Sequence, residues 1–125
     1  MIYVDTSALA KLLLTREPGS GAVRELADRA GFISSRLLQL EMHAVAWRRG
    51  QPLAEAQLVI ERVHLVPLDD DILSIAIAQR SGLRSLDAIH LATIALLGEV
   101  VEAVLTFDAG LRAASESIGV PAIAL

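Results

Sequence analysis

Short apolar runs rich in β-branched residues alternate along the chain with longer segments whose apolar residues recur every three to four positions. The short runs predict strands at residues 2–4, 32–34, 63–68, 103–107 and 119–125. The longer segments predict helices at residues 8–14, 22–30, 36–49, 52–61, 72–79, 85–97 and 109–117. This alternation predicts a three-layer α/β fold, in which a mainly parallel central sheet is flanked by helices.

Length and composition limit the class of protein. The chain has 125 residues, of which 54% are hydrophobic, so we expect a single domain over residues 1–125. No apolar run approaches the ~18 residues of a membrane span, and no basic segment opens the chain as in an export signal. Together with the absence of cysteine, this favours a cytoplasmic protein. The surplus of apolar residues for so small a chain favours a homodimer.

The charge is acidic overall. The formal net charge is -4 and the isoelectric point is about 5.3, so the surface as a whole would not attract a polyanion. Lys11 is the only lysine, and Arg48 and Arg49 form the only adjacent pair of basic residues. Any binding of nucleic acid must therefore rely on a local patch.

An acid follows the first strand and the fourth strand directly. Asp5 follows the apolar run at residues 2–4, and Asp108 follows the run at residues 103–107. Open α/β sheets place their ligands at the carboxyl ends of parallel strands, so both acids are candidate site residues. Aspartate is also a preferred helix N-cap, and for either acid alone the capping interpretation remains open.

Glu41 is an acid on an apolar stripe of the helix predicted at residues 36–49. Leu37, Leu38, Val45 and Arg48 share its face at helical spacing. A buried carboxylate needs a partner, usually a cation, because desolvating it alone costs several kcal/mol. The alternative is that Glu41 lies at a ragged edge of the stripe and reaches solvent.

Three further positions carry groups that could take part in a site. Asp87 lies in the first turn of the apolar helix at residues 85–97, where the helix dipole alone explains an acid but would also suit a metal ligand. His90 follows one turn later and could touch such a site, although a core histidine is its expected role. The acids at residues 69–71 are best explained as capping the helix that they precede.

If Asp5, Glu41, Asp87 and Asp108 converge, their charges must be compensated. Two charges ~4 Å apart repel by about 4 kcal/mol at an effective dielectric constant of 20. A divalent cation would relieve this repulsion, and oxygen ligands favour Mg²⁺ or Mn²⁺ over zinc. Such ions support hydrolysis of phosphodiester bonds by activating a bound water. Spacing alone does not establish that the acids converge.

The order of four motifs resembles the PIN-domain family and, more narrowly, the VapC toxins of bacterial and archaeal toxin–antitoxin pairs. The motifs are V-D-T-S-A-L at residues 4–9, L-E at 40–41, L-D-A-I-H-L-A-T at 86–93 and L-T-F-D at 105–108. The resemblance extends to the G-V-P at residues 119–121 and covers essentially the whole chain. No single motif is specific, whereas their joint order and spacing are.

The resemblance implies a PIN-like fold and an endoribonuclease that depends on Mg²⁺ or Mn²⁺. It implies a catalytic and metal-binding quartet at Asp5, Glu41, Asp87 and Asp108. It also implies supporting hydroxyl groups at Ser7 and Thr106.

The resemblance further implies three kinds of partner. These are an RNA substrate, a cognate antitoxin of the VapB type whose C-terminal segment covers the site, and a second copy of the chain in a homodimer. The apolar helices that contain Trp47 and Leu58 are candidate surfaces, although a tryptophan is more often part of the core.

Other acidic α/β proteins fit the sequence less well. A haloacid dehalogenase-type phosphatase needs a second aspartate two residues after the first, where this chain has Ser7. A receiver domain needs a lysine near its last strand, and a zinc hydrolase needs an H-x-x-x-H spacing; neither is present. A non-catalytic PIN-like interaction module remains the non-enzymatic alternative, although the four acids are all in place.

Overall fold

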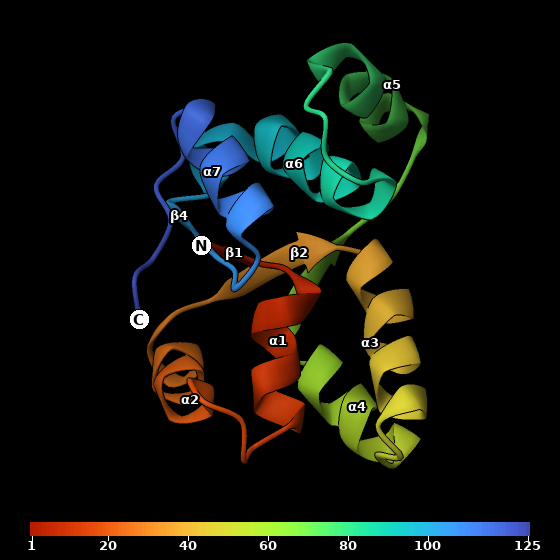
Figure 1. The fold of residues 1–125 in the computed structure, drawn as a ribbon, viewed down its shortest axis with the longest axis vertical. Coiled ribbons are helices and arrows are strands. Elements are labelled where there is room, and N and C mark those ends of the chain that lie inside the picture. Colours follow the sequence, from red (N-terminus) through yellow and green to blue (C-terminus); the bar gives the residue numbers. More distant parts are fainter.

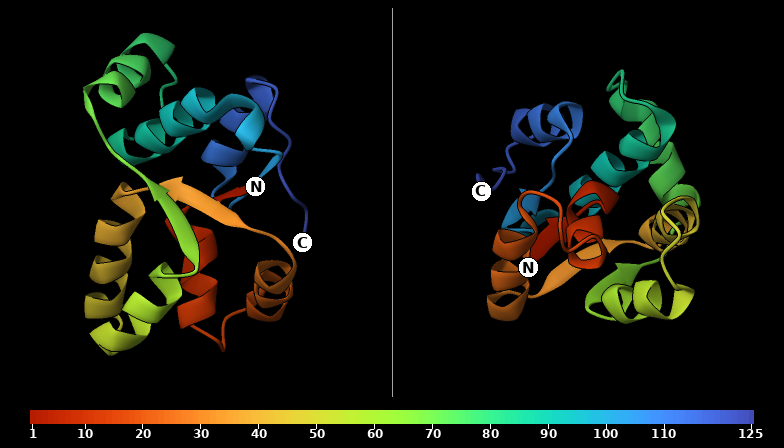
Figure 2. Two further views of the ribbon diagram at one scale, coloured as in Figure 1. Left: turned by 180° about the vertical axis from the view of Figure 1, so that it is seen from behind. Right: turned by 60° about the horizontal axis from the view of Figure 1, so that its bottom comes forward.

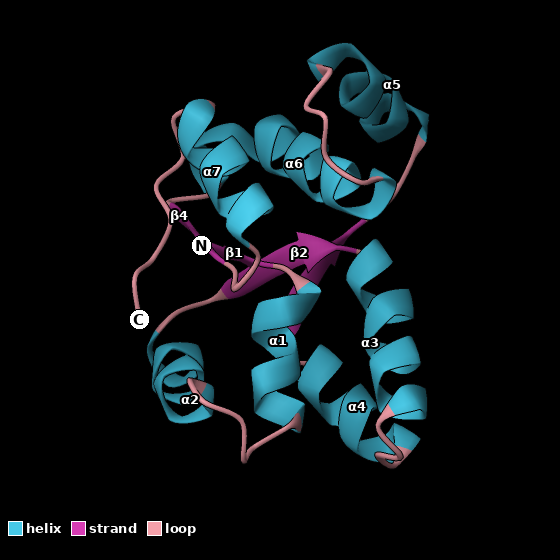
Figure 3. Ribbon diagram, viewed as in Figure 1, coloured by secondary structure: helices cyan, strands magenta, loops and turns pink.

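The computed structural model describes residues 1–125 and has three layers, a parallel sheet between two layers of helices (Figure 1, Figure 3). The four strands have the order β3-β2-β1-β4, and every neighbouring pair is parallel. The elements in chain order are β1 (Ile2–Val4), α1 (Thr6–Leu13), α2 (Ser20–Arg29), β2 (Phe32–Ser35), α3 (Leu37–Arg48), α4 (Leu53–Ile60), β3 (Val63–Val66), α5 (Asp70–Gln79), α6 (Ser85–Leu97), the 3₁₀ helix η1 (Gly98–Val100), β4 (Ala103–Leu105) and α7 (Ala109–Ser117). The predicted fold class is confirmed.

Side chains alternate between the two faces of the sheet and form two separate apolar clusters. Ile2 and Val4 of β1 join the larger cluster with α1, α2, α3 and α4, whereas Tyr3 points to the smaller cluster with α6 and α7. The view from behind in Figure 2 shows α1 to α4 on one side of the sheet and α5 to α7 on the other. No helix combines the length and the apolar character that crossing a membrane requires.

The strand order places a topological switch point beside β1. The chain steps from β1 to β2 to β3 and then returns to add β4 on the opposite side of β1. Val4 pairs in register with Leu105, so the residues that follow them, Asp5 and Thr106, lie side by side at the carboxyl edge. In open parallel sheets, ligands bind in the crevice at such a switch point.

The strand predicted at residues 119–125 is wrong. Only one isolated bridge forms there, between Val104 and Ala122. The Val104 N–H donates to the Pro121 carbonyl (2.9 Å), and the Ile123 N–H donates to the Val104 carbonyl (2.8 Å). Because Pro121 has no N–H to donate, the ladder does not extend into a strand.

The face that α3 buries also differs from the predicted stripe. Its buried residues are Leu37, Leu38, Met42 and Ala46. Glu41 lies on the flank of this face and is partly exposed, and Arg48 is fully on the surface. Trp47 is 89% exposed, so the expectation that it belongs to the core is wrong.

Candidate active site at the carboxyl edge of the sheet

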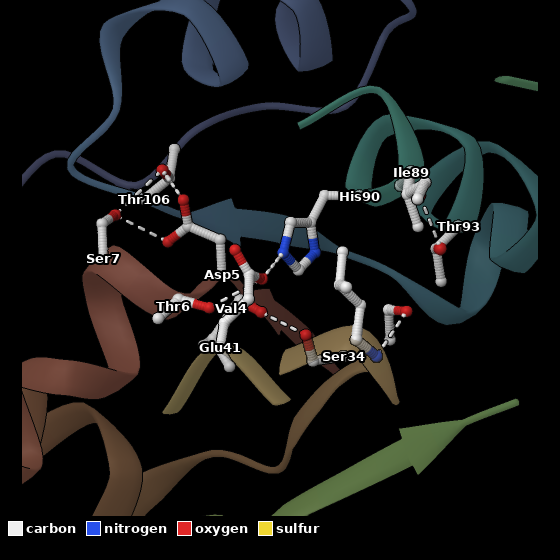
Figure 4. A network of polar contacts seen from close by, with 12 residues as sticks. Val4, Asp5, Thr6, Ser7, Ser34, Glu41, Ile89, His90, Thr93 and Thr106 are labelled. Carbon is white, nitrogen blue, oxygen red and sulfur yellow. Dashed lines mark hydrogen bonds and ion pairs between the residues drawn. The ribbon is translucent and has the colours of Figure 1, made fainter. Parts of the chain in front are cut away.

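Asp5 is a buried carboxylate held by three donors. It is the N-cap of α1, and its Oδ1 accepts hydrogen bonds from the Ala8 N–H (3.0 Å) and the Ser7 hydroxyl (2.7 Å). Its Oδ2 accepts one from the Thr106 hydroxyl (2.6 Å), and the residue is 3% exposed. The capping interpretation is thus confirmed. Capping does not exclude a role in a site, because Ser7 and Thr106 fix the carboxylate from two further sides (Figure 4).

The surroundings of Asp5 oppose its negative charge. Burial raises the pKa of Asp5 above its ordinary value, because the ionised form is removed from water. The hydrogen bonds from Thr106 and Ser7 act in the opposite direction, since they stabilise the carboxylate. An ionised Asp5 would therefore gain from a cation close by.

Glu41 of α3 lies next to Asp5 and is held by two donors of different elements (Figure 4). Its Oε1 accepts hydrogen bonds from the Thr6 hydroxyl (2.9 Å) and from Nε2 of His90 (2.8 Å). The side chain is 19% exposed, so it does not reach freely into solvent. It forms no ion pair with an arginine or a lysine. Its Oε2 has no hydrogen-bond partner and stays available to a ligand.

His90 connects Glu41 to the core through a buried hydrogen-bond chain. The Tyr3 hydroxyl accepts a hydrogen bond from the Ser35 N–H (3.3 Å) and lies 2.7 Å from Nδ1 of His90. Donation of the Tyr3 proton to Nδ1 leaves the proton of the ring on Nε2, which then donates to Glu41. With Tyr3 and His90 at 0% and 1% exposure, this chain fixes the direction of the Glu41 carboxylate.

His90 combines the two roles that the sequence left open for it, a core histidine and a residue that touches the site. The core position expected for it is confirmed, but one of its ring nitrogens also contacts a candidate site residue. The available signal was spacing, because His90 lies three residues after Asp87 and therefore on the same side of α6.

The charges of the other three candidate acids all act on Asp87. Desolvation raises the pKa of Asp87, and the negative charge of Asp108 raises it further. The charges of Asp5 and Glu41 add to this increase, whereas His90 lowers the pKa of Asp87. Hydrogen bonds join the segments that carry these acids. The Thr106 hydroxyl donates to Asp5 and accepts from the Asp108 N–H. His90, one turn after Asp87, donates to Glu41.

Asp108 caps α7 and is tied to the loop that holds Asp5. Its Oδ1 accepts a hydrogen bond from the Leu111 N–H (2.8 Å), and its own N–H donates to the Thr106 hydroxyl (3.0 Å). A Cβ atom at Gly110 would lie 3.2 Å from Asp108 Oδ1, so glycine leaves room for this carboxylate. Oδ2 of Asp108 has no hydrogen-bond partner.

The acids at residues 69–71 lie outside this candidate site. Asp69 is the N-cap of α5, and its Oδ1 accepts a hydrogen bond from the Ile72 N–H (3.1 Å). All three acids are exposed. The capping interpretation is confirmed for them.

The donor set of the four acids fits a hard divalent cation. The oxygens left without partners on Glu41, Asp87 and Asp108 are negatively charged, as Mg²⁺ and Mn²⁺ prefer. No three acidic or histidine side chains of the structure already stand at ligating distances from a common point. Mutual repulsion opposes a closer approach of carboxylates, and a cation would remove that repulsion.

Comparisons with known proteins agree with this fold. The family model of the PIN domain matches residues 2–117. Ribonuclease VapC47 of Mycobacterium tuberculosis strain CDC 1551 is 36% identical, with 95% of this chain and 93% of the relative covered. Ribonuclease VapC46 of Mycobacterium tuberculosis strain H37Rv is 35% identical, with 98% and 96% covered.

Solved structures of low sequence identity share the fold. The structure of VapC20 from Mycobacterium tuberculosis, a toxin that cleaves the sarcin–ricin loop, superposes with a TM-score of 0.78 at 20% identity over 100% of both chains. A toxin–antitoxin complex from Klebsiella pneumoniae gives a TM-score of 0.68 at 19% identity, with 86% of this chain and 87% of that chain covered. The chain therefore belongs to the PIN-domain family, and its curated relatives are VapC ribonucleases.

Proposed function

We propose that the chain is the toxin of a VapBC-type toxin–antitoxin system, a cytoplasmic endoribonuclease whose single nuclease domain spans residues 1–125. The observation that carries the proposal is a hydrogen-bond network at the switch point of the sheet. In this network Thr106 donates to Asp5 and accepts from the Asp108 N–H, and His90, one turn after Asp87, donates to Glu41. Relatives that share 35–36% of their residues with the chain and are named ribonucleases support RNA as the substrate.

In this proposal, Asp5, Glu41, Asp87 and Asp108 hold Mg²⁺ or Mn²⁺ and are the catalytic residues. The bound ion would supply an activated water and neutralise charge at the phosphodiester. Ser7 and Thr106 support the site by holding the Asp5 carboxylate in one direction through hydrogen bonds of 2.7 and 2.6 Å.

Thr6 and His90 perform the same task for Glu41. Both donate to Oε1, so Oε2 is directed away from them and stays free. Orientation of this kind matters because hydrogen-bond partners of metal ligands commonly contribute 10- to 100-fold in metal affinity or activity.

The first prediction concerns the metal. We expect the purified chain to cleave single-stranded or loop RNA in Mg²⁺ or Mn²⁺ and to lose this activity in EDTA, since the acids alone provide no electrophile. Gel analysis of end-labelled RNA before chelation, after chelation and after renewed addition of Mg²⁺ measures both steps. Cleavage that continues at the same rate in excess EDTA would contradict the metal-dependent mechanism.

The partners belong to the proposal as well. A cognate antitoxin of the VapB type is inferred from the VapC relatives, and a homodimer from the apolar side chains left on the surface. Trp47 is 89% and Leu58 is 64% exposed, and exposed apolar patches commonly mark interaction surfaces. These two side chains are the candidate surface for either partner.

The second prediction concerns the homodimer. We expect light scattering to give twice the monomer mass at micromolar protein, and Trp47→Gln to shift the equilibrium towards monomer, because tryptophan is a frequent hot spot of interfaces. The thermal stability of the folded chain should change little, since the side chain lies outside the core. A monomer at micromolar concentration would count against the dimer.

A further inference from the structure

A groove leads away from the acids between α1 and α3. Two adjoining cavities form it: the smaller, of about 280 Å³, reaches Glu41, and the larger, of about 340 Å³, reaches Phe107. Thr6, Val45 and Arg48 line both cavities, so the two adjoin at these side chains. Figure 1 shows α1 and α3 both running away from the same edge of the sheet.

Basic side chains gather in the larger of the two cavities. Lys11 lies four residues after Ser7 on α1, and Arg48 lies seven residues after Glu41 on α3. With a rise of 1.5 Å per residue, these cations stand roughly 6 and 10 Å farther along their helices than Ser7 and Glu41. Arg49 joins them in the lining of the larger cavity. The lining of the smaller cavity therefore has one acid and one cation, Glu41 and Arg48, whereas cations predominate in the larger cavity.

The larger cavity keeps an excess of positive charge. Glu17 is the single acid in the lining of the larger cavity, and it forms ion pairs with Lys11 (3.4 Å) and Arg49 (3.3 Å). Arg48 is exposed and takes part in no ion pair. Three cations thus face one acid on a chain whose net charge is -4, which supplies the local patch that a polyanion needs.

Phe107 adds a fixed aromatic surface beside these cations. Its ring is 42% exposed, and its N–H donates to the Ser7 hydroxyl (2.8 Å). The Lys11 ammonium lies 4.9 Å from the ring centroid. A Cβ atom at Gly19 would lie 3.2 Å from the ring, so the ring is packed closely against that backbone. Aromatic rings next to basic side chains are the common means of binding unpaired bases.

We propose that this groove binds single-stranded RNA next to the scissile phosphodiester, with a neighbouring phosphate at Arg48 and Lys11 and an unpaired base stacked on Phe107. The inference rests on the proposed function, because it places the scissile phosphate at the acids. Single-stranded RNA fits better than a duplex, since paired bases are stacked on one another and cannot cover the Phe107 ring.

Equilibrium binding tests the groove without cleavage. All variants carry Asp5→Asn, which silences hydrolysis in the proposed function, and the probe is a fluorescein-labelled oligouridylate of about ten nucleotides. Fluorescence anisotropy is recorded in Mg²⁺ over a series of salt concentrations, and a labelled RNA duplex of the same length serves as the second probe. Arg24→Gln is the matched control, because Arg24 is an exposed arginine of α2 outside both cavities.

Charge and stacking give different signatures in this experiment. Arg48→Gln should weaken binding and reduce the slope of log affinity against log salt by about 0.7, the contribution of one single-strand phosphate contact. Phe107→Leu should weaken binding of the single strand by about tenfold with an unchanged slope, and should leave the duplex unaffected. Arg24→Gln should leave the slope near that of the protein that carries Asp5→Asn alone. Thermal melts establish that each variant is folded.

Kinetics separate a failure of the groove from a failure of the proposed function. With the acids intact, Arg48→Gln and Phe107→Leu should raise KM for single-stranded RNA and preserve kcat, because both act on nucleotides beside the reacting phosphate. If the parent cleaves RNA while both variants bind and cleave it as the parent does, the groove is wrong and the proposed function stands. If the parent cleaves no RNA in Mg²⁺ or Mn²⁺, both inferences fail.

Discussion

Asp5→Asn should reduce RNA cleavage by at least about a hundredfold, the usual scale for losing one charged group that acts directly on the transition state. The amide preserves the shape of the side chain, and its oxygen can still accept from the Ala8 N–H and the Ser7 hydroxyl. Besides the charge, it loses the acceptor of the Thr106 hydroxyl, because an amide nitrogen replaces Oδ2. Initial rates with end-labelled RNA in saturating Mg²⁺ measure the effect.

Asp69→Asn is the matched control for this substitution. Asp69 caps α5 as Asp5 caps α1, with Oδ1 accepting the N–H three residues ahead in both cases. Asparagine caps a helix about as well as aspartate, so Asp69→Asn should leave cleavage and stability near the parental values. An Asp5→Asn enzyme as active as Asp69→Asn would leave Asp5 with a capping role alone.

Removing the charge of Asp5 should also change how stability depends on pH. Because burial raises the folded-state pKa of Asp5, the metal-free folded chain holds this proton more tightly than the unfolded chain does. The contribution of Asp5 to the free energy of unfolding is then fully present below the ordinary pKa of aspartate, and it is lost as the pH rises through the folded-state pKa of Asp5. Melts in EDTA from about pH 4 to about pH 8 should show Asp5→Asn at least as stable as the parent at neutral pH, with a weaker dependence on pH.

Asp87→Asn should give the second large loss of cleavage, again at least about a hundredfold. Asp87 responds to Asp108, Asp5 and Glu41, so its substitution relieves repulsion in the metal-free protein while removing a proposed ligand. Asp71→Asn is the matched control, because Asp71 also lies in the first turn of its helix but is exposed and outside the site. Equal cleavage rates for Asp87→Asn and Asp71→Asn would exclude a special role for Asp87.

Local sequence patterns were sufficient to predict most of the helices and strands, and to assign each of the four acids to one of these elements or to its end. Each strand of the sheet is a short apolar run that stops at a polar residue or a proline, and Asp5 stands where the first run ends. Asp108 was expected directly after a strand at residues 103–107, but β4 ends at Leu105 and Asp108 is the N-cap of α7. The parallel order then brings these ends together, because Val4 and Leu105 are in register. What the pattern could not establish was convergence, which depends on the strand order rather than on any single segment.

The misplaced features depend on contacts between distant segments. Pro121 accepts from the Val104 N–H but has no N–H with which to continue the ladder, so the last apolar run forms a single bridge. The face of α3 is set by α1 and α4, which cover Met42 and Ala46 and leave Trp47 outside. The contact between His90 and Glu41 joins residues 49 positions apart, and helical spacing within either helix carries no information about it.

Titration of Mn²⁺ into the metal-free protein by calorimetry tests the central claim most directly, that the acids at the switch point form a divalent metal site. The account predicts saturable binding to the parent and to Asp69→Asn, and strongly weakened binding to Asp5→Asn, because a buried carboxylate of the proposed metal site is replaced by a neutral amide. Binding to Asp5→Asn with the affinity of the parent, or no binding to the parent at millimolar Mn²⁺, would contradict the account.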